Sequence, residues 1–178
     1  MKKKIIIIML IICIFNITGC GNKVNSNENN SSVTNNKENK NVVKVNGEEI
    51  ELTYDTNFNN MYFKENVSKF NTNTMGSNHV IQYIKEGKVL FDIRMAYIEN
   101  KTMEESKKEI NFEVNPKKIN DLEYQYGTWE TKDNETGETI YIHQYLYEFN
   151  GTTYTIAFMS KTNIDDFEAA FMKNVYFK

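Results

Sequence analysis

Hydrophobic residues follow three different patterns along this chain. An unbroken apolar run extends from Ile5 to Phe15, residues 21–41 are almost entirely polar, and apolar residues alternate with polar ones from Val42 onward. Alternation at every second position indicates strands with one buried face. The pattern therefore predicts a short N-terminal segment over 1–19, a polar linker over 20–41 and one globular domain over 42–178.

Two hairpins are expected in the first half of that domain. The first joins Val43–Val45 to alternating residues over Ile50–Tyr54 through Asn46-Gly47, a dipeptide favoured in two-residue turns. The second joins Val80–Lys85 to Val89–Ile98, whose apolar residues share one face. Between the hairpins, we expect a short strand over Met61–Lys64 and a loop over Asn71–Asn78.

Two helices are expected in the second half. Thr102 and Glu105 form a capping box, which opens a helix to about Asn111. Thr162 or Asn163 can cap the C-terminal helix, whose apolar residues follow a spacing of three and four. This stripe should pack on a sheet. It consists of Phe167, Ala170 and Phe171.

Three long alternating segments separate the two helices. They are Leu122–Lys132, Thr139–Phe149 and Thr152–Ser160. Short connections between them favour antiparallel neighbours. The expected fold is α+β: a single domain with an antiparallel sheet of about five to seven strands and two helices, the C-terminal helix packed on the sheet.

A two-residue turn at Asn150-Gly151 fixes the register of the last hairpin, because it places Phe149 opposite Thr152. One face of this ribbon, the aromatic surface, then carries Tyr141, His143, Tyr145, Tyr147, Tyr154, Ile156 and Phe158. Tyr124 and Tyr126 join it if the preceding strand pairs in the matching register.

The first twenty residues have the pattern of an export signal, with three lysines, an apolar run and small residues before Cys20. The run is shorter than the roughly 20 residues that span a bilayer. Ile17-Thr18-Gly19-Cys20 resembles the lipobox of bacterial lipoproteins. The resemblance implies cleavage before Cys20, a diacylglyceryl group with fatty acids such as palmitate on its thiol, and anchoring to the outer face of the cytoplasmic membrane. An ordinary cleaved signal with a coincidental cysteine is the alternative.

Charge and cysteine content exclude several functions. Cys13, the only other cysteine, leaves with the signal, so no disulfide within the chain and no cysteine metal site or thiol catalysis is expected. From Val42 on, fifteen basic and twenty-two acidic residues give a net charge of −7. This charge argues against nucleic acid and against adhesion to anionic lipids. The Asn- and Ser-rich residues 20–41 predict a disordered tether.

The aromatic surface has two interpretations. Tyrosine rings could stack on sugar rings of the wall, which makes Tyr141, His143, Tyr145, Tyr147 and Tyr154 a candidate binding surface. Alternatively, these residues form the core beneath the C-terminal helix, and this second reading is the preferred one.

Candidate chemistry is sparse. We interpret His143 as a structural histidine, although a metal pair with His79 stays open. Asp133, Glu135 and Glu138 could suggest a calcium loop, but they lack EF-hand spacing and are read as a solvated hairpin. No nucleophile elbow, phosphate loop or zinc-protease motif occurs. We therefore expect no enzyme, cofactor or metal.

The order of elements, with long strands, a Phe-rich helix and Val175-Tyr176-Phe177 at the end, resembles the PsbP/DcrB-like α/β fold over about 58–178. That resemblance implies an accessory role in a membrane assembly and supplies no functional residue. The leading hypothesis is a non-catalytic envelope lipoprotein that binds a membrane protein, another protein or wall glycan. The alternative is a wall-directed hydrolase that uses His143 and carboxylates; a transport receptor would normally need two lobes.

Overall fold

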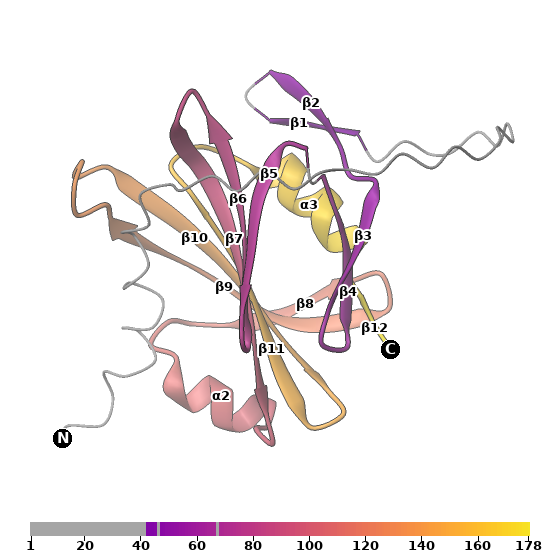
Figure 1. The fold of residues 1–178 in the computed structure, drawn as a ribbon. Coiled ribbons are helices and arrows are strands. Elements are labelled where there is room, and N and C mark those ends of the chain that lie inside the picture. The colour runs from indigo at the N-terminus through magenta and orange to yellow at the C-terminus, as the bar shows by residue number, and fades with distance from the viewer. Residues whose placement is uncertain (1–41, 46, 67) are drawn as a thin grey trace, which may run out of the picture. The chain divides into compact units, whose positions relative to one another are not determined.

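A seven-stranded antiparallel sheet runs through the structure, a computed structural model that describes residues 42–178 except 46 and 67 (Figure 1). Its strands lie in the order β5, β6, β7, β11, β10, β9, β8. In that order they span Phe70–Met75, Asn78–Lys85, Lys88–Glu99, Thr152–Ser160, Thr139–Phe149, Leu122–Lys132 and Asn115–Ile119. The predicted signal, Cys20 and the tether lie outside the described residues.

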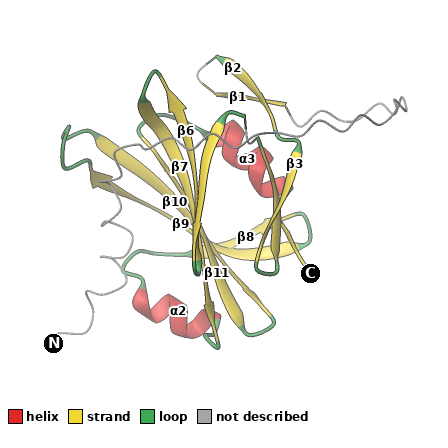
Figure 2. Cartoon of the chain, in the orientation of Figure 1, coloured by secondary structure: helices red, strands yellow, loops and turns green. Residues whose placement is uncertain are grey.

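Two smaller sheets and two helices complete the described chain (Figure 2). β1 (Val42–Val45) and β2 (Glu48–Glu51) form a hairpin. A three-stranded sheet has the order β12 (Tyr176–Phe177), β4 (Met61–Glu65), β3 (Tyr54–Phe58). The helices are α2 (Met103–Glu109) and α3 (Asp165–Lys173). The antiparallel seven-stranded sheet and the two helices confirm the expected fold class in outline.

Aromatic side chains fill the main core. Phe167 and Phe171 of α3 are 0% and 1% exposed, and their rings lie 4.7 Å from Phe91 and 5.6 Å from Phe158, respectively. The same buried cluster includes apolar residues of the first hairpin and of the three-stranded sheet. Full burial of one such side chain contributes about 1.5–3 kcal/mol to the free energy of folding. This cluster therefore contributes much of the stability of the packed elements.

Much of the opposite face of β10 and β11 is also buried, including Ile142, Leu146 and Met159. Thr153 donates to the Lys101 carbonyl at 2.7 Å, and the Met103 backbone donates to Glu148 at 2.6 Å, which ties the start of α2 to this face. The chain after α2 then passes very close to β9. A Cβ on Gly127 would lie only 2.3 Å from the Glu113 carbonyl oxygen. Glycine is therefore required at this position.

The predicted register of the last hairpin is confirmed. Phe149 lies opposite Thr152 and Tyr147 opposite Tyr154. Tyr126 pairs with Tyr145 on the next strand, so the matching register of β9 is confirmed as well. The capping box at Thr102 and Glu105 is present in α2. The two early hairpins, the strand after Asn60 and the three long strands are confirmed too.

Three expectations need correction, and one edge strand was missed. The segment expected as a loop, Asn71–Asn78, contains most of β5, whose alternating Asn and Thr residues suit a solvated edge strand. Tyr54 belongs to β3 in another sheet and does not extend β2. The N-cap of α3 is Ile164, without a side-chain cap, whereas Thr162 and Asn163 lie before it. The edge strand β8 was not predicted.

Candidate functional site

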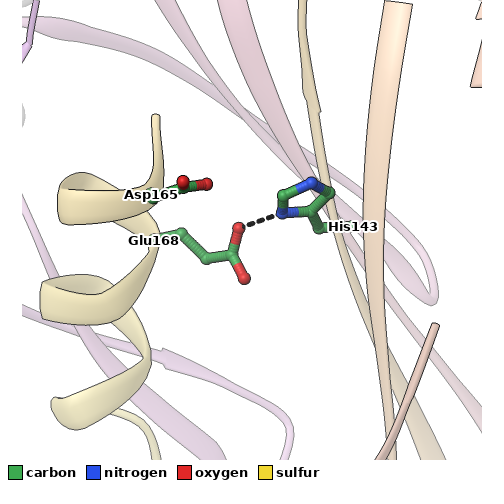
Figure 3. A group of neighbouring side chains, drawn as sticks. All are labelled: His143, Asp165 and Glu168. Atoms are coloured by element: carbon green, nitrogen blue, oxygen red, sulfur yellow. Dashed lines mark hydrogen bonds and ion pairs between the residues drawn. The ribbon is translucent and has the colours of Figure 1, made fainter. Parts of the chain in front are cut away.

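A histidine of β10 faces two carboxylates in the first turn of α3 (Figure 3). His143 Nδ1 lies 2.5 Å from Glu168 Oε2. Asp165 and Glu168 are three residues apart and therefore project from the same side of the helix. The nearest ligand atoms of His143, Asp165 and Glu168 all lie within 4.8 Å of one another. We call these three side chains the His143 cluster.

Glu168 is the buried member of the cluster, with only 4% of its surface exposed. Its Oε1 accepts a hydrogen bond from the Tyr145 hydroxyl, and the Lys117 ammonium lies 3.9 Å from the same oxygen. Lys117 also donates to the Tyr145 hydroxyl at 2.8 Å. A buried carboxylate is costly unless it is paired and hydrogen-bonded, and these partners supply both forms of compensation.

The cluster changes the proton affinity of its neighbours. The hydrogen bond to Glu168 raises the pKa of His143 above its ordinary range, while burial acts in the opposite direction. A carboxylate can only accept, so Nδ1 carries the proton in this contact. Burial, and then the Glu168 hydrogen bond, raises the pKa of Tyr145. Burial and the two carboxylates raise the pKa of Tyr126 to about 12.

A pocket of about 460 Å³ adjoins the cluster. Residues from β10, from the end of β11 and from the connection to α3 form its wall. They are Tyr141, His143, Phe158, Ser160, Lys161, Thr162, Asn163, Ile164 and Asp165. Tyr141 is 46% exposed, so an aromatic ring is available to a ligand beside His143 and Asp165. Glu168 does not line the pocket and lies on the buried side of His143.

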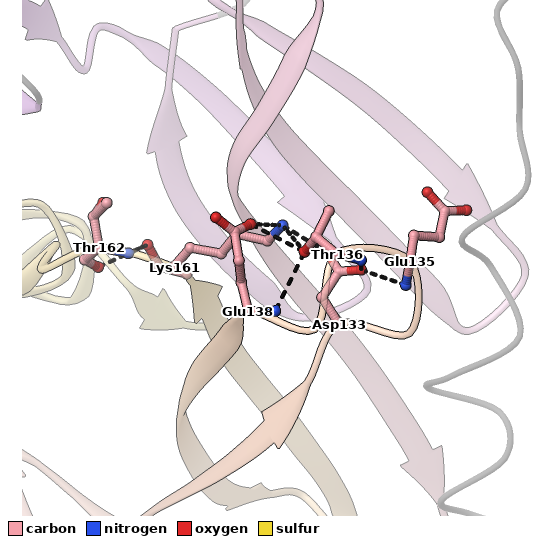
Figure 4. A network of polar contacts seen from close by, with 7 residues as sticks. Asp133, Glu135, Thr136, Glu138, Lys161 and Thr162 are labelled. Carbon is pink, nitrogen blue, oxygen red and sulfur yellow. Dashed lines mark hydrogen bonds and ion pairs between the residues drawn. The ribbon is translucent and has the colours of Figure 1, made fainter.

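Lys161 fixes one wall of this pocket to the loop between β9 and β10 (Figure 4). Its ammonium lies 2.6 Å from both Asp133 and Glu138. The hydrogen bond from Lys161, with backbone hydrogen bonds from Glu135 and Thr136, lowers the pKa of Asp133 to about 2. Two of the three acidic residues considered for a calcium loop, Asp133 and Glu138, are thus paired with the ammonium group of Lys161.

Ser160 is a serine in the wall of this pocket and could be considered as a nucleophile. Its hydrogen bonds, however, go to the backbone of Thr162. Its Oγ donates to the Thr162 carbonyl at 2.8 Å and accepts from the Thr162 backbone nitrogen at 3.1 Å. A serine nucleophile needs its proton directed to a base such as histidine. The arrangement observed here is that of a turn.

The residues of the predicted binding surface fall into two groups, one in the core and one at the pocket. Tyr145 and Tyr154 are 1% and 0% exposed, and Tyr147 is half-buried with its ring 4.5 Å from Phe177. An exposed tyrosine platform for sugars is therefore wrong for Tyr145 and Tyr154, because core packing covers them. Tyr141 and the partly exposed His143 remain at the pocket.

The carboxylate partner Glu168 was missed by sequence reasoning. It lies four residues after Ile164 and beside Phe167, which places it at the edge of the apolar stripe of α3. Its place beside the apolar stripe could have indicated, from the sequence alone, that this carboxylate is buried. His79, the other histidine, is 5% exposed, and its ring contacts those of Phe58 and Phe63. The His143 cluster does not include it.

Comparisons with known proteins show the fold and nothing further. No family model matches the chain, and no curated protein matches its sequence. A crystal structure of a protein from Bacteroides thetaiotaomicron VPI-5482 is similar, with a TM-score of 0.53 and 9% sequence identity. The match covers 67% of this chain but only 45% of that protein. None of the helices in the part of the chain that the structure describes is long and apolar enough to cross a membrane.

Proposed function

We propose that the chain is a lipid-anchored protein of the bacterial envelope, with a non-catalytic accessory or binding role. The lipobox-like sequence ending at Cys20 and the polar residues after it support anchoring outside the cytoplasmic membrane. Two acyl chains anchor a protein stably where one holds it only marginally. The net charge of −7 from Val42 onward favours an anchor over charge-driven adhesion.

Hydrogen bonds among the polar groups around the pocket favour a binding role over catalysis. Glu168 is held by His143 and Tyr145, and Ser160 is held by the backbone of Thr162. In contrast, Tyr141 and Asp165 are exposed where the pocket opens. Groups bonded to one another favour a rigid recognition surface, because a reacting group must be able to meet its substrate.

We infer that α3 stays packed on the sheet and so keeps the pocket in shape. The ring contacts of Phe167 with Phe91 and of Phe171 with Phe158 support this packing. The first turn of α3 supplies Asp165 at the wall of the pocket. A displacement of the helix would therefore separate Asp165 from Tyr141 and His143.

The proposed partner is an envelope protein or wall glycan that contacts the pocket, and nucleic acid is not proposed. The resemblance to the PsbP/DcrB-like fold supports an accessory role by analogy alone. In-cell cross-linking with the full chain, followed by capture, tests the proposal. Tyr141→Ala should lose the cross-linked partner, whereas Tyr54→Ala, at a tyrosine that is 55% exposed on β3, should retain it. Equal capture by both variants would reject the pocket as the binding surface.

A wall-directed hydrolase is the second candidate, because His143 is paired with a buried carboxylate and lines a pocket. A histidine held in this way resembles an oriented general base. Purified full-length protein applied to peptidoglycan decides between the two. Release of soluble fragments that is abolished by His143→Ala would favour the hydrolase, and absence of release favours the binding role.

A further inference from the structure

The His143 cluster combines ligand types that transition metals prefer. It supplies one imidazole nitrogen and two carboxylates, with their nearest ligand atoms within 4.8 Å of one another. Within residues 42–178, excluding 46 and 67, it is the group of at least three such residues whose ligand atoms lie this close together. Zinc is commonly bound by three such side chains and a water molecule.

The charge balance at the cluster favours a cation. Lys161, which lines the same pocket, already pairs with Asp133 and Glu138. The Asp165 carboxylate accepts a hydrogen bond from the Asn163 amide at 2.8 Å, and the Asp165 backbone nitrogen donates to the Asn163 side-chain oxygen at 3.0 Å. Within the described part of the chain, Asp165 forms no ion pair. Glu168 contacts the Nδ1 proton of His143 and has a lysine ammonium at 3.9 Å, so Asp165 is the carboxylate of the cluster without a cationic partner within the described residues.

The pocket gives a cation access to the cluster. His143 and Asp165 line it, and Glu168 lies behind them. The Tyr145 hydroxyl fixes Glu168 from the buried side, in the manner of the outer hydrogen bonds that orient metal ligands. Asp165 is exposed, so water from the pocket can complete the coordination of an ion.

We propose that His143 Nδ1, Asp165 and Glu168 bind a divalent transition-metal ion of the zinc class. The ion takes the place of the proton between Nδ1 and Glu168, and imidazolium releases one proton to solvent. This proposal departs from the sequence-based expectation of no metal. Imidazole among the ligands favours zinc over calcium or magnesium, which prefer oxygen ligands.

The contact between His143 and Glu168 needs only a small adjustment to admit the ion. Zinc lies about 2.0–2.2 Å from nitrogen and oxygen ligands, so neighbouring ligand atoms stand roughly 3 to 3.5 Å apart. The distance between Nδ1 and Oε2 is 2.5 Å and must increase by about 1 Å or less to reach this separation. The side chains of His143 and Asp165 border open space and can make this movement.

A competition titration tests the proposal. Full-length, tag-free protein in detergent is titrated with Zn²⁺ against a chromophoric chelator, which reports the dissociation constant. Asp165→Asn should weaken binding at least about tenfold, since loss of even an outer partner costs a metal site that much. Asp166→Asn is the matched control, because Asp166 is the next residue, is exposed and does not belong to the cluster. It should bind as the parent does.

Histidine NMR gives a second readout that needs no variant. The chain contains two histidines, and the buried His79 serves as an internal reference. Zn²⁺ should shift the ring nitrogen signals of His143 and leave those of His79 unchanged, with tighter binding as the pH rises. Absence of a His143 shift, a shift of both rings alike, or equal affinities for Asp165→Asn and Asp166→Asn would each overturn the proposal.

Discussion

His143 on β10 and Glu168 on α3, 25 residues apart in the chain, are joined by a 2.5 Å contact between Nδ1 and Oε2. The contact connects the central sheet to the C-terminal helix beside the pocket. It pairs a partly exposed imidazole with a carboxylate that is only 4% exposed. Loss of the proton from Nδ1 at high pH therefore removes the hydrogen bond between β10 and α3.

The pair should make the stability of the protein depend on pH in a defined direction. Because the folded state raises the pKa of His143, its contribution to folding is complete below the ordinary histidine pKa of about 6.5. It is lost as the pH rises through the folded pKa. Urea unfolding of the parent and His143→Gln should thus differ most under acidic conditions, and the difference should shrink under alkaline ones.

An NMR titration checks the cause of this effect. Glu168→Gln should lower the pKa of His143, because the largest contribution to the upward shift is the hydrogen bond to Glu168. His79 provides a reference within the same sample, and burial lowers its pKa. An unchanged His143 titration in Glu168→Gln would show that the pair does not set the shift.

Truncation of a core aromatic residue on α3 should cost far more than truncation of an exposed one. Phe167 is 0% exposed and contacts Phe91, so Phe167→Ala should lower the free energy of unfolding by about 3–5 kcal/mol. Met75→Ala is the control, since Met75 is 61% exposed on edge strand β5 and should change stability by about 0.5 kcal/mol or less. Urea denaturation measures both; similar losses would argue against the burial of α3.

The close passage of residues 112–113 over β9 predicts that Gly127 tolerates no side chain. In Gly127→Ala the new Cβ would meet the Glu113 carbonyl at 2.3 Å and the Phe112 ring at 2.8 Å. Displacing backbone should cost about 1–3 kcal/mol in thermal or urea unfolding. Thr128→Ala, at the adjacent exposed position, should be nearly neutral. A neutral Gly127→Ala would mean that the segment is not held there.

The ammonium of Lys161 should control the ionisation of the loop between β9 and β10. In Lys161→Ala the pKa of Asp133 should rise from about 2 toward its ordinary value, because the hydrogen bond from Lys161 is the largest cause of the depression. NMR of the carboxyl carbon follows this change. Lys132→Ala removes a nearby lysine whose hydrogen bond goes to Thr139, and it should leave the Asp133 pKa low. The stabilisation from Asp133 is present above a pH of about 4 and fades as the pH falls through about 2.

Sequence reasoning succeeded where local chemistry fixes long stretches of backbone. Asn150-Gly151 sets the turn, and strict alternation on both sides then determines which residues of β10 and β11 face each other. It failed at β5 and β8, the two edges of the seven-stranded sheet. An edge strand needs little apolar surface, so its sequence resembles a loop.

The candidate site could be predicted only in part. His143 and Tyr141 were recognised because the register of one hairpin places them on one face. Glu168, the partner of His143, comes from α3, and Lys117, which contacts Glu168 and Tyr145, comes from β8. Only the three-dimensional packing of those elements brings them to β10. The buried state of Tyr145 and Tyr154 likewise follows from what covers the sheet. A pattern along the chain contains no such information.

Fatty acylation at Cys20 is the most direct test of the account. Cells that express the full chain are labelled with a fatty acid and fractionated, and the parent is compared with Cys20→Ala and with Cys13→Ala, which removes the only other cysteine. The parent and Cys13→Ala should carry the label and sediment with membranes, and Cys20→Ala should lose the label. Persistent labelling of Cys20→Ala, or a parent protein found in the cytosol with Met1 attached, would contradict the proposed anchor.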